Sequence, residues 1–321
     1  MGLWDRLRER LHPIGEDDPD LPEALKRAAW RVEPRLEQAR GWPKHYVRPI
    51  AGALAQARKV AAGIPGPVTL DAGRYAADPY VHVLFGSAEA IDHLLRTSPA
   101  VKSYIGTAQE GEAYALLTAI RREKHVLGME LEGDIVRRDV PQTQVWFTDH
   151  QLLGLAKSEA EAREALLWIL FDRFLERVAV GVERLRAERY RLNQEKDLAQ
   201  ARLRGATATS RSGAKAVLER VLKQLTETVQ SLELENLHDV FETVLSHPQD
   251  CLYLRPYDLI LDAMGTVHTR PGEGASQIEF VELWERYQPP RTVTLVHCHG
   301  LSIANSGSRH GRLDEAAGWL R

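Results

Sequence analysis

Two histidines with one residue between them stand near the C-terminal end of the chain, at His297 and His299. On a β-strand, residues two apart point to the same side of the sheet, so both imidazoles can reach one metal ion. Zinc is the metal that this pair would take if a third protein ligand lies nearby. The alternative is a pair of solvated or hydrogen-bonded imidazoles on an edge strand. The candidates for the third ligand are Cys251, His247 and His268.

A second cluster that can bind a ligand is basic. Residues 202–215 contain four cations and no acidic residue, around a loop rich in glycine and hydroxyl groups. Such a loop can hold phosphate groups or an acidic partner surface. It lacks the Gly-Lys-Ser/Thr of a P-loop, and no aromatic residues alternate with its charges, so single-strand stacking is not expected. The alternative is a solvated tip. The four cations are Arg202, Arg204, Arg211 and Lys215.

Motifs for common enzyme classes are missing from the chain. It has no Gly-x-Ser-x-Gly, no His-Glu-x-x-His, no Cys-x-x-Cys pair and no Gly-x-Gly-x-x-Gly before a helix. No catalytic and no cofactor-binding residue is therefore assigned. The motif search favours a non-enzymatic protein, with zinc at the two histidines as the one cofactor considered.

The element that positions the basic cluster is a predicted helical hairpin over residues 158–245, with its tip at 205–213. Ser158 and Glu161 have the spacing of a capping box, which is typical of a helix start. Glycines at both ends of the tip predict that the helix stops and restarts there. The alternative is a broken amphipathic helix packed inside an all-helical domain.

Apolar residues repeat along both arms of this hairpin with steps of three and four. This spacing predicts a coiled-coil seam, which is the row of side chains that faces a partner helix. Arg189 and Lys196 interrupt it, and polar residues at such positions can fix the register. The predicted seam residues are Phe171, Leu175, Val178, Val182, Leu185, Leu192, Ala199 and Leu203 in the first arm, and Leu218, Leu222, Leu225, Val229 and Leu232 in the second.

The two arms have opposite charge. Residues 173–204 hold nine basic and five acidic residues, a net charge of +4, and residues 214–245 hold three basic and six acidic residues, a net charge of −3. Equal length, opposite charge and a short loop favour an antiparallel hairpin. The pattern leaves open whether the seam is filled within one chain or by a second chain.

Strand-like segments flank the hairpin on both sides. Short β-branched runs before it predict a three-strand meander over 126–132, 134–140 and 142–148, with an edge or a bend at Pro141. Further runs with the same composition follow the hairpin. We therefore predict an α+β fold with a small antiparallel β-rich body, built from 124–150 and 250–299, into which the hairpin is inserted.

The N-terminal region, residues 1–123, is predicted to be mainly helical. Caps and apolar periodicity indicate helices from Asp20 to about Gln38, shortened by Pro34, and from Tyr46 to Gly63. Ser87–Leu95 and Thr107–Arg122 are the other two predicted helices. Residues 3–11 form a short amphipathic stretch, for which docking on the protein itself is favoured over contact with a membrane surface. Residues 300–321 are predicted to be a tail.

Composition bounds the compartment and the partners. The net charge of −3 gives no global attraction to nucleic acid, and two cysteines do not make a disulfide framework. No apolar run reaches the length of a membrane span, so a cytoplasmic protein is predicted. The leading hypothesis is an interaction or scaffold protein that uses the hairpin for self-association or partner docking. The alternatives are a nucleic-acid or phosphate binder that uses the basic tip, and a metal-dependent enzyme or sensor that uses His297 and His299.

Overall fold

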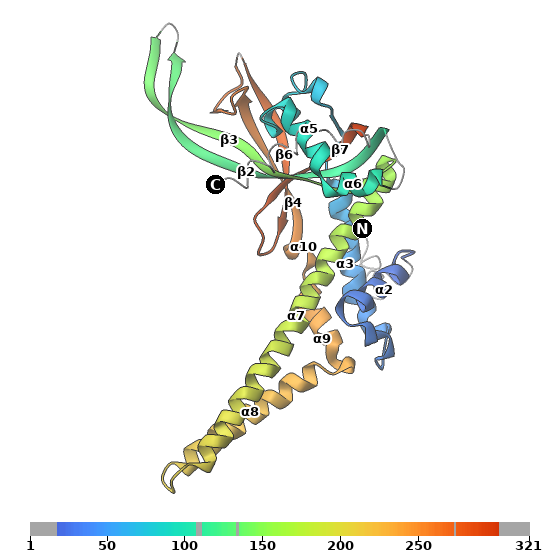
Figure 1. Ribbon diagram of the computed structural model, residues 1–321, viewed down its shortest axis with the longest axis vertical. Coiled ribbons are helices and arrows are strands. Elements are labelled where there is room, and N and C mark those ends of the chain that lie inside the picture. Colours follow the sequence, from blue (N-terminus) through green and yellow to red (C-terminus); the bar gives the residue numbers. More distant parts are fainter. Residues whose placement is uncertain (1–17, 107–110, 133–134, 273, 302–321) are drawn as a thin grey trace, which may run out of the picture. The chain divides into compact units, whose positions relative to one another are not determined.

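The chain has an α+β fold in which a helical hairpin is inserted between two strands, as predicted (Figure 1). The computed structural model of the protein describes residues 18–106, 111–132, 135–272 and 274–301. These residues form two compact units, whose boundaries fall within α3 (Lys44–Gly63) and α7 (Glu159–Arg204). Unit 1 comprises the described residues of Met1–Arg58 and Leu170–Asp250, and unit 2 those of Lys59–Ile169 and Cys251–Arg321. The predicted N-terminal region, residues 1–123, is therefore divided between the two units.

Unit 2 contains a seven-stranded sheet in the order β3-β2-β7-β6-β4-β5, with β1 also beside β7. The β1–β7 pair is parallel, and the other strand pairs are antiparallel. Because β2 pairs with β7, the strand-rich segments before and after the hairpin share one sheet. The strands are β1 (Val68–Leu70), β2 (Gly111–Glu132), β3 (Ile135–Ala156), β4 (Leu252–Asp262), β5 (Val267–His268), β6 (Ala275–Glu285) and β7 (Arg291–Leu301).

Two predictions for the segment before the hairpin are wrong. The predicted helix over Thr107–Arg122 is strand β2 from Gly111 onward, and the predicted meander is only two strands, β2 and β3, of 22 residues each. Pro141 does not interrupt β3, where it stands opposite Leu127. The missing N–H of a proline is tolerated there because β3 is the edge strand of the sheet.

Short helices cover one face of this sheet and bury its main core. The covering helices are α4 (Pro79–Leu84), α5 (Ala88–Thr97) and α6 (Pro99–Ile105). Alternate residues of β2, namely Ala113, Ala115 and Leu117, belong to the same buried cluster as Cys298 of β7. The alternation means that the residues between them, including those at positions 112 and 114, point to the opposite face.

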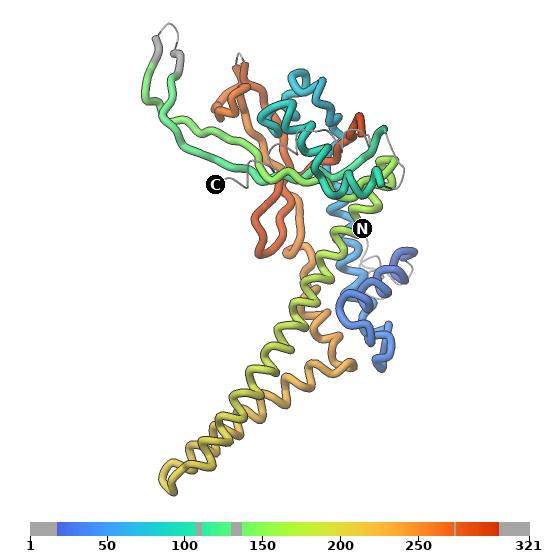
Figure 2. The backbone as a smooth tube through the Cα atoms, viewed as in Figure 1, coloured from blue at the N-terminus to red at the C-terminus, as the bar shows by residue number. Residues whose placement is uncertain are grey.

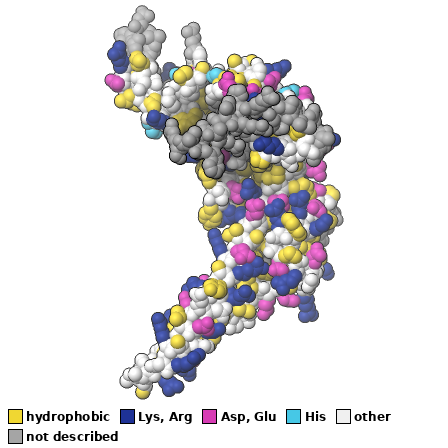
Figure 3. Space-filling model, in the orientation of Figure 1, with side chains coloured by type: hydrophobic (Ala, Val, Ile, Leu, Met, Phe, Trp, Pro, Cys, Tyr) yellow, Lys and Arg dark blue, Asp and Glu magenta, His cyan; other side chains and the backbone are white. Residues whose placement is uncertain are grey.

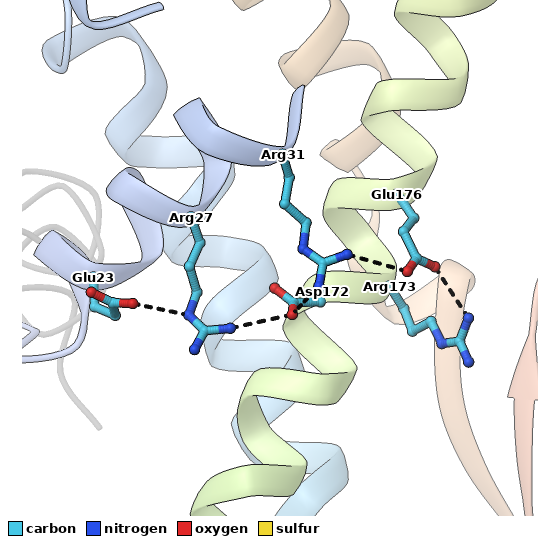
Figure 4. A network of polar contacts seen from close by, with 6 residues as sticks. All are labelled: Glu23, Arg27, Arg31, Asp172, Arg173 and Glu176. Carbon is cyan, nitrogen blue, oxygen red and sulfur yellow. Dashed lines mark hydrogen bonds and ion pairs between the residues drawn. The ribbon is translucent and has the colours of Figure 1, made fainter. Parts of the chain in front are cut away.

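Unit 1 contains α2 (Leu21–Val32), which is joined to α7 by a network of ion pairs (Figure 4). Asp172 of α7 accepts hydrogen bonds from the guanidinium groups of Arg27 at 3.2 Å and Arg31 at 2.8 Å. Arg31 also lies 3.5 Å from Glu176, one helical turn further along. Pro34 ends α2 as predicted, and the chain continues as η1 (Pro34–Gln38).

The hairpin in unit 1 is formed by α7 and α8 (Arg211–Ser231), and Figure 2 shows α8 returning along α7 from the tip. The Ser158 hydroxyl accepts a hydrogen bond from the Glu161 N–H at 3.3 Å, as the predicted capping box requires. Along α7, the seam residues Phe171, Leu175, Val178, Val182, Leu192 and Ala199 are buried, whereas Leu185 and Leu203 are half-buried.

The second arm differs from its prediction in two ways. Val221 is buried, whereas the predicted seam residues Leu222 and Val229 are 40% and 41% exposed. Residues 221 and 222 are both apolar, so the spacing alone leaves the rotation of α8 ambiguous, and packing against α7 selects Val221. Leu218, Leu225 and Leu232 are half-buried, which places them at the contact.

This arm is also interrupted after Ser231. The 3-10 helix η3 (Leu234–Asn236) separates α8 from α9 (Leu237–Leu245), and α10 (Pro248–Cys251) leads into the sheet. The Asn236 side chain donates a hydrogen bond to the Gln230 carbonyl at 2.9 Å, which closes the break. The amphipathic stretch of residues 3–11 and the tail from residue 302 lie outside the described residues. In the part of the chain that is described, every helix is too short or too polar to cross a bilayer.

Candidate metal centre

The predicted histidine pair lies on β7, beside the start of β2. Tyr114 of β2 pairs directly with His297, and Ala113 pairs with Cys298. The register then shifts, because Gly111 pairs with Leu301. Glu112 alone therefore faces two residues of β7, His299 and Gly300, and this two-against-one arrangement is a β-bulge. Gly300 has a φ of 71°, a conformation that glycine adopts without steric cost.

This bulge brings one carboxylate between the two imidazoles. His297 Nε2 donates a hydrogen bond to Glu112 Oε2 at 3.1 Å, and His299 Nδ1 lies 2.9 Å from Glu112 Oε1. The two imidazole rings are 4.2 Å apart between their centroids. One ligand atom from each of the three residues lies within 4.8 Å of the others. We call these three residues the His-Glu-His cluster.

Neighbouring residues hold the cluster in place on one face of the sheet. The Tyr114 ring stacks on the His297 ring, with 4.2 Å between centroids and 3° between planes. On the other side of β7, Thr69 of β1 is the register partner of His297. Cys298 points to the opposite face, where burial raises the pKa of its thiol to about 12. The cysteine between the two histidines is therefore not a ligand of the same site.

The donor set of the cluster suits a divalent transition metal. Two imidazole nitrogens and one carboxylate oxygen are ligands that zinc accepts, at bond lengths of about 2.1 Å. In a tetrahedral site, such bonds separate the ligand atoms by about 3.4 Å. The two contacts of Glu112 need to open by only a few tenths of an ångström to reach that value. The cluster is also accessible, because the Glu112 side chain is 58% exposed.

The third ligand that the sequence suggested is replaced by a different residue. Among the described residues, the cluster contains Glu112 and none of the predicted candidates Cys251, His247 and His268. Cys251 is buried, and His268 lies 3.1 Å from Asp262 in the β4–β5 turn. Glu112 was missed because its segment was predicted to be helical. The small residues that alternate at 113, 115 and 119 were the available signal for a strand.

The basic tip is present but does not form a comparable site. Arg202, Arg204, Arg211 and Lys215 are all exposed around the turn between α7 and α8. Lys215 lies 3.6 Å from Glu219, one turn into α8. Figure 3 shows Lys and Arg side chains gathered over this end of the hairpin. Its four cations stand on an open surface rather than in a cavity.

No protein-family model, curated protein or solved structure matches this chain.

Proposed function

We propose that the protein binds one divalent transition-metal ion, in the first instance zinc, through Glu112, His297 and His299. The observation that carries this proposal is that each oxygen of the Glu112 carboxylate lies within 3.1 Å of a nitrogen of a different histidine. A metal ion would take the place of the two protons that these contacts share. The flanking strands β1 and β2 support the proposal, because they hold the ligands before any metal arrives.

The number of ligands indicates what kind of site this would be. Structural zinc sites usually have four protein ligands, whereas catalytic sites have three and keep one position for water or a substrate. The His-Glu-His cluster offers three ligands on an accessible face. The proposed class is therefore a metal-dependent enzyme or a metal sensor, in which the bound ion keeps an exchangeable position.

Zinc binding to the purified protein tests this proposal. After treatment with a chelator and dialysis, the protein should bind one equivalent of zinc in a calorimetric titration. Glu112→Ala and His299→Ala should abolish this binding, whereas His247→Ala and His268→Ala, which remove the other candidate ligands, should retain it. Affinity should fall as the pH is lowered, because the ligands must lose protons to bind the metal. Equal zinc binding by all four variants would contradict the proposal.

A second candidate function is self-association through the hairpin. The observation that favours it is the exposure of Leu222 and Val229 on α8, at 40% and 41%. These residues are seven apart and therefore lie on one face of the helix. We call them the outer stripe. A helix from a second copy of the chain would bury this stripe.

The charges on either side of the outer stripe support a second copy as the partner. The tip before it carries the exposed cations of residues 202–215. The segment after it carries exposed carboxylates at Glu233, Glu235, Asp239 and Glu242. Two hairpins that pair antiparallel about the stripe would place the basic tip of each against the acidic segment of the other.

Light scattering coupled to size exclusion tests self-association. The wild type should elute with a mass above 36.1 kDa, and Leu222→Lys with Val229→Lys should elute as a monomer. Leu127→Lys with Met264→Lys, which changes two exposed residues of unit 2, should keep the wild-type mass. Added salt should shift the wild type toward the monomer, because it screens the proposed charge pairs. A wild type that stays monomeric at all concentrations would refute this candidate function.

A further inference from the structure

A cavity in unit 1 is lined by three arginines and a single carboxylate. The cavity has a volume of about 370 Å³ at most by comparison with the other cavities of the protein, and its own volume is about 310 Å³. Arg35 reaches it from η1, and Arg186 and Arg189 reach it from α7. Glu33 is its one acidic residue, so the charged lining has a net charge of +2. We call it the arginine cavity.

The single carboxylate orients two of the three guanidinium groups. Glu33 is buried, and its Oε1 accepts a hydrogen bond from Arg35 Nε at 2.8 Å. Its Oε2 accepts one from Arg186 Nη2, also at 2.8 Å. The hydrogen bond from Arg35 lowers the pKa of Glu33, so this carboxylate is ionised at neutral pH. Both oxygens of Glu33 are occupied, and the remaining N–H groups of the two arginines stay available to a ligand.

Arg189 supplies a third guanidinium that is held by no carboxylate. Within the described ranges, the Arg189 side chain has neither a hydrogen bond nor an ion pair. Arg189 interrupts the predicted seam of α7, where an apolar residue is normally selected. The second arm also breaks at this level, since Leu232 and Leu237, on either side of the break, line the same cavity. A seam position that faces a cavity rather than a packed helix explains why an arginine is tolerated there.

We propose that the arginine cavity binds the phosphate group of a small phosphomonoester. Guanidinium groups present paired N–H donors that match the oxygens of a phosphate, and they keep their charge at all physiological pH values. Two positive charges in excess suit a phosphate dianion. The volume lies at the lower end of the range for small-molecule sites, which favours a small ligand over a polymer. Glu233 and Glu235 stand in the same break but do not line the cavity.

Calorimetric titration with inorganic phosphate tests this site, against sodium chloride at equal ionic strength. The wild type should bind phosphate saturably, and Arg189→Ala should weaken this binding by about tenfold or more. Arg189→Lys keeps the charge but loses the paired donors, so it should bind with intermediate affinity. The matched control is Arg184→Ala, which removes an exposed arginine of α7 outside the cavity and should bind as the wild type does.

Three further outcomes decide between explanations. Circular dichroism should show that the Arg189 variants are folded, since the residue is exposed. The His299→Ala variant should bind phosphate like the wild type, which separates this site from a metal ion that captures phosphate. Succinate should bind more weakly than phosphate, whereas tighter binding of succinate would overturn the assignment to a phosphomonoester. Equal phosphate binding by Arg189→Ala and Arg184→Ala, or no saturable binding by the wild type, would overturn the site itself.

Discussion

At the scale of single residues, the direction of each side chain decides what chemistry it can take part in. His297 and His299 share one face of β7, and the thiol of Cys298 between them is buried on the other face. The alternation of a strand therefore separates two ligand types that are neighbours in the sequence. Glu112 joins the histidines because a bulge in β7 sets it against two residues.

His150 should make the stability of the protein depend on pH. Burial lowers the pKa of this histidine below 6.5, and its ring stacks on Phe85 while Nε2 donates a hydrogen bond to the Leu84 carbonyl. Above about pH 6.5, the folded and unfolded states are both neutral at this site, and the stability is complete. Below that pH, the unfolded state binds a proton that the folded state refuses, so the free energy of unfolding should fall.

Urea denaturation between pH 8 and pH 5.5, as approximate limits of the relevant window, measures this effect. The wild type should lose stability as the pH drops, and His150→Gln should show a flatter dependence. The control is His125→Gln, which changes an exposed histidine of β2 and should retain the wild-type slope. The acidic residues with lowered pKa values, Asp149 and Glu33, lose their contribution only at more acidic pH. The same slope in both variants would show that His150 is not the group responsible.

At the scale of elements, the helical hairpin illustrates how a pattern predicts an element but not its rotation. The steps of three and four along α7 predicted its buried residues, because one helix face is apolar and the others are charged. On α8 the apolar residues at 221 and 222 are neighbours, and either one satisfies the same spacing. The contact with α7 decides between them, and it buries Val221.

Two leucines of the hairpin should therefore respond differently to truncation. Leu192→Ala removes a buried side chain of the seam and should lower the free energy of unfolding by about 2–5 kcal/mol. Leu222→Ala truncates an exposed side chain and should change it by about 0.5 kcal/mol or less in the monomer. Urea denaturation at a protein concentration low enough to exclude association measures both. Similar losses for the two variants would place Leu222 in the seam after all.

Glycine 265 of the β4–β5 turn tests a close approach between elements. It has a φ of 74°, and a Cβ atom added there would lie 2.4 Å from the carbonyl oxygen of Val145 on β3. Gly265→Ala should destabilise unit 2 by about 1–3 kcal/mol, because the backbone conformation and the close contact both oppose a side chain. Gly213→Ala, in α8 with no atom within 4 Å, should be neutral or stabilise by about 0.5–1 kcal/mol. Thermal unfolding of the two variants checks the contrast.

At the scale of the whole molecule, the metal centre and the hairpin belong to different units. The core that packs beneath the strands of unit 2 contains residues from 70 to 152 and from 261 to 301, and none from the hairpin. The His-Glu-His cluster lies on strands of the same unit. We therefore expect metal binding to be independent of the distal hairpin, whereas self-association should require it.

Shortening the hairpin tests this separation. Replacing residues 194–220 by a glycine linker keeps Leu192 and Val221, which are both buried near the new turn. This variant should lose helical circular dichroism, remain monomeric and still bind one equivalent of zinc. The full-length chain, measured in the same buffer, is the control. Loss of zinc binding together with cooperative unfolding would show that the two units are not separable.

The sequence by itself determined the α+β class, the helical hairpin and its tip, the buried face of α7 and the helices at both ends of Pro34 and Ser87. These features depend on local signals, namely caps, turn residues and the period of apolar side chains. The histidine pair could also be found in this way, because two residues on one strand have a known spacing.

Only the tertiary structure decided the rest. Glu112 and His299 are 187 residues apart and meet because β2 pairs with β7, and nothing local specifies that pairing. The segment from Gly111 to Arg122 forms a strand because its small residues pack beneath helices in a buried sheet, which overrides its helical propensity. The arginine cavity likewise combines η1, α7 and the break after α8. Local patterns therefore specify the elements, whereas long-range packing brings their functional side chains together.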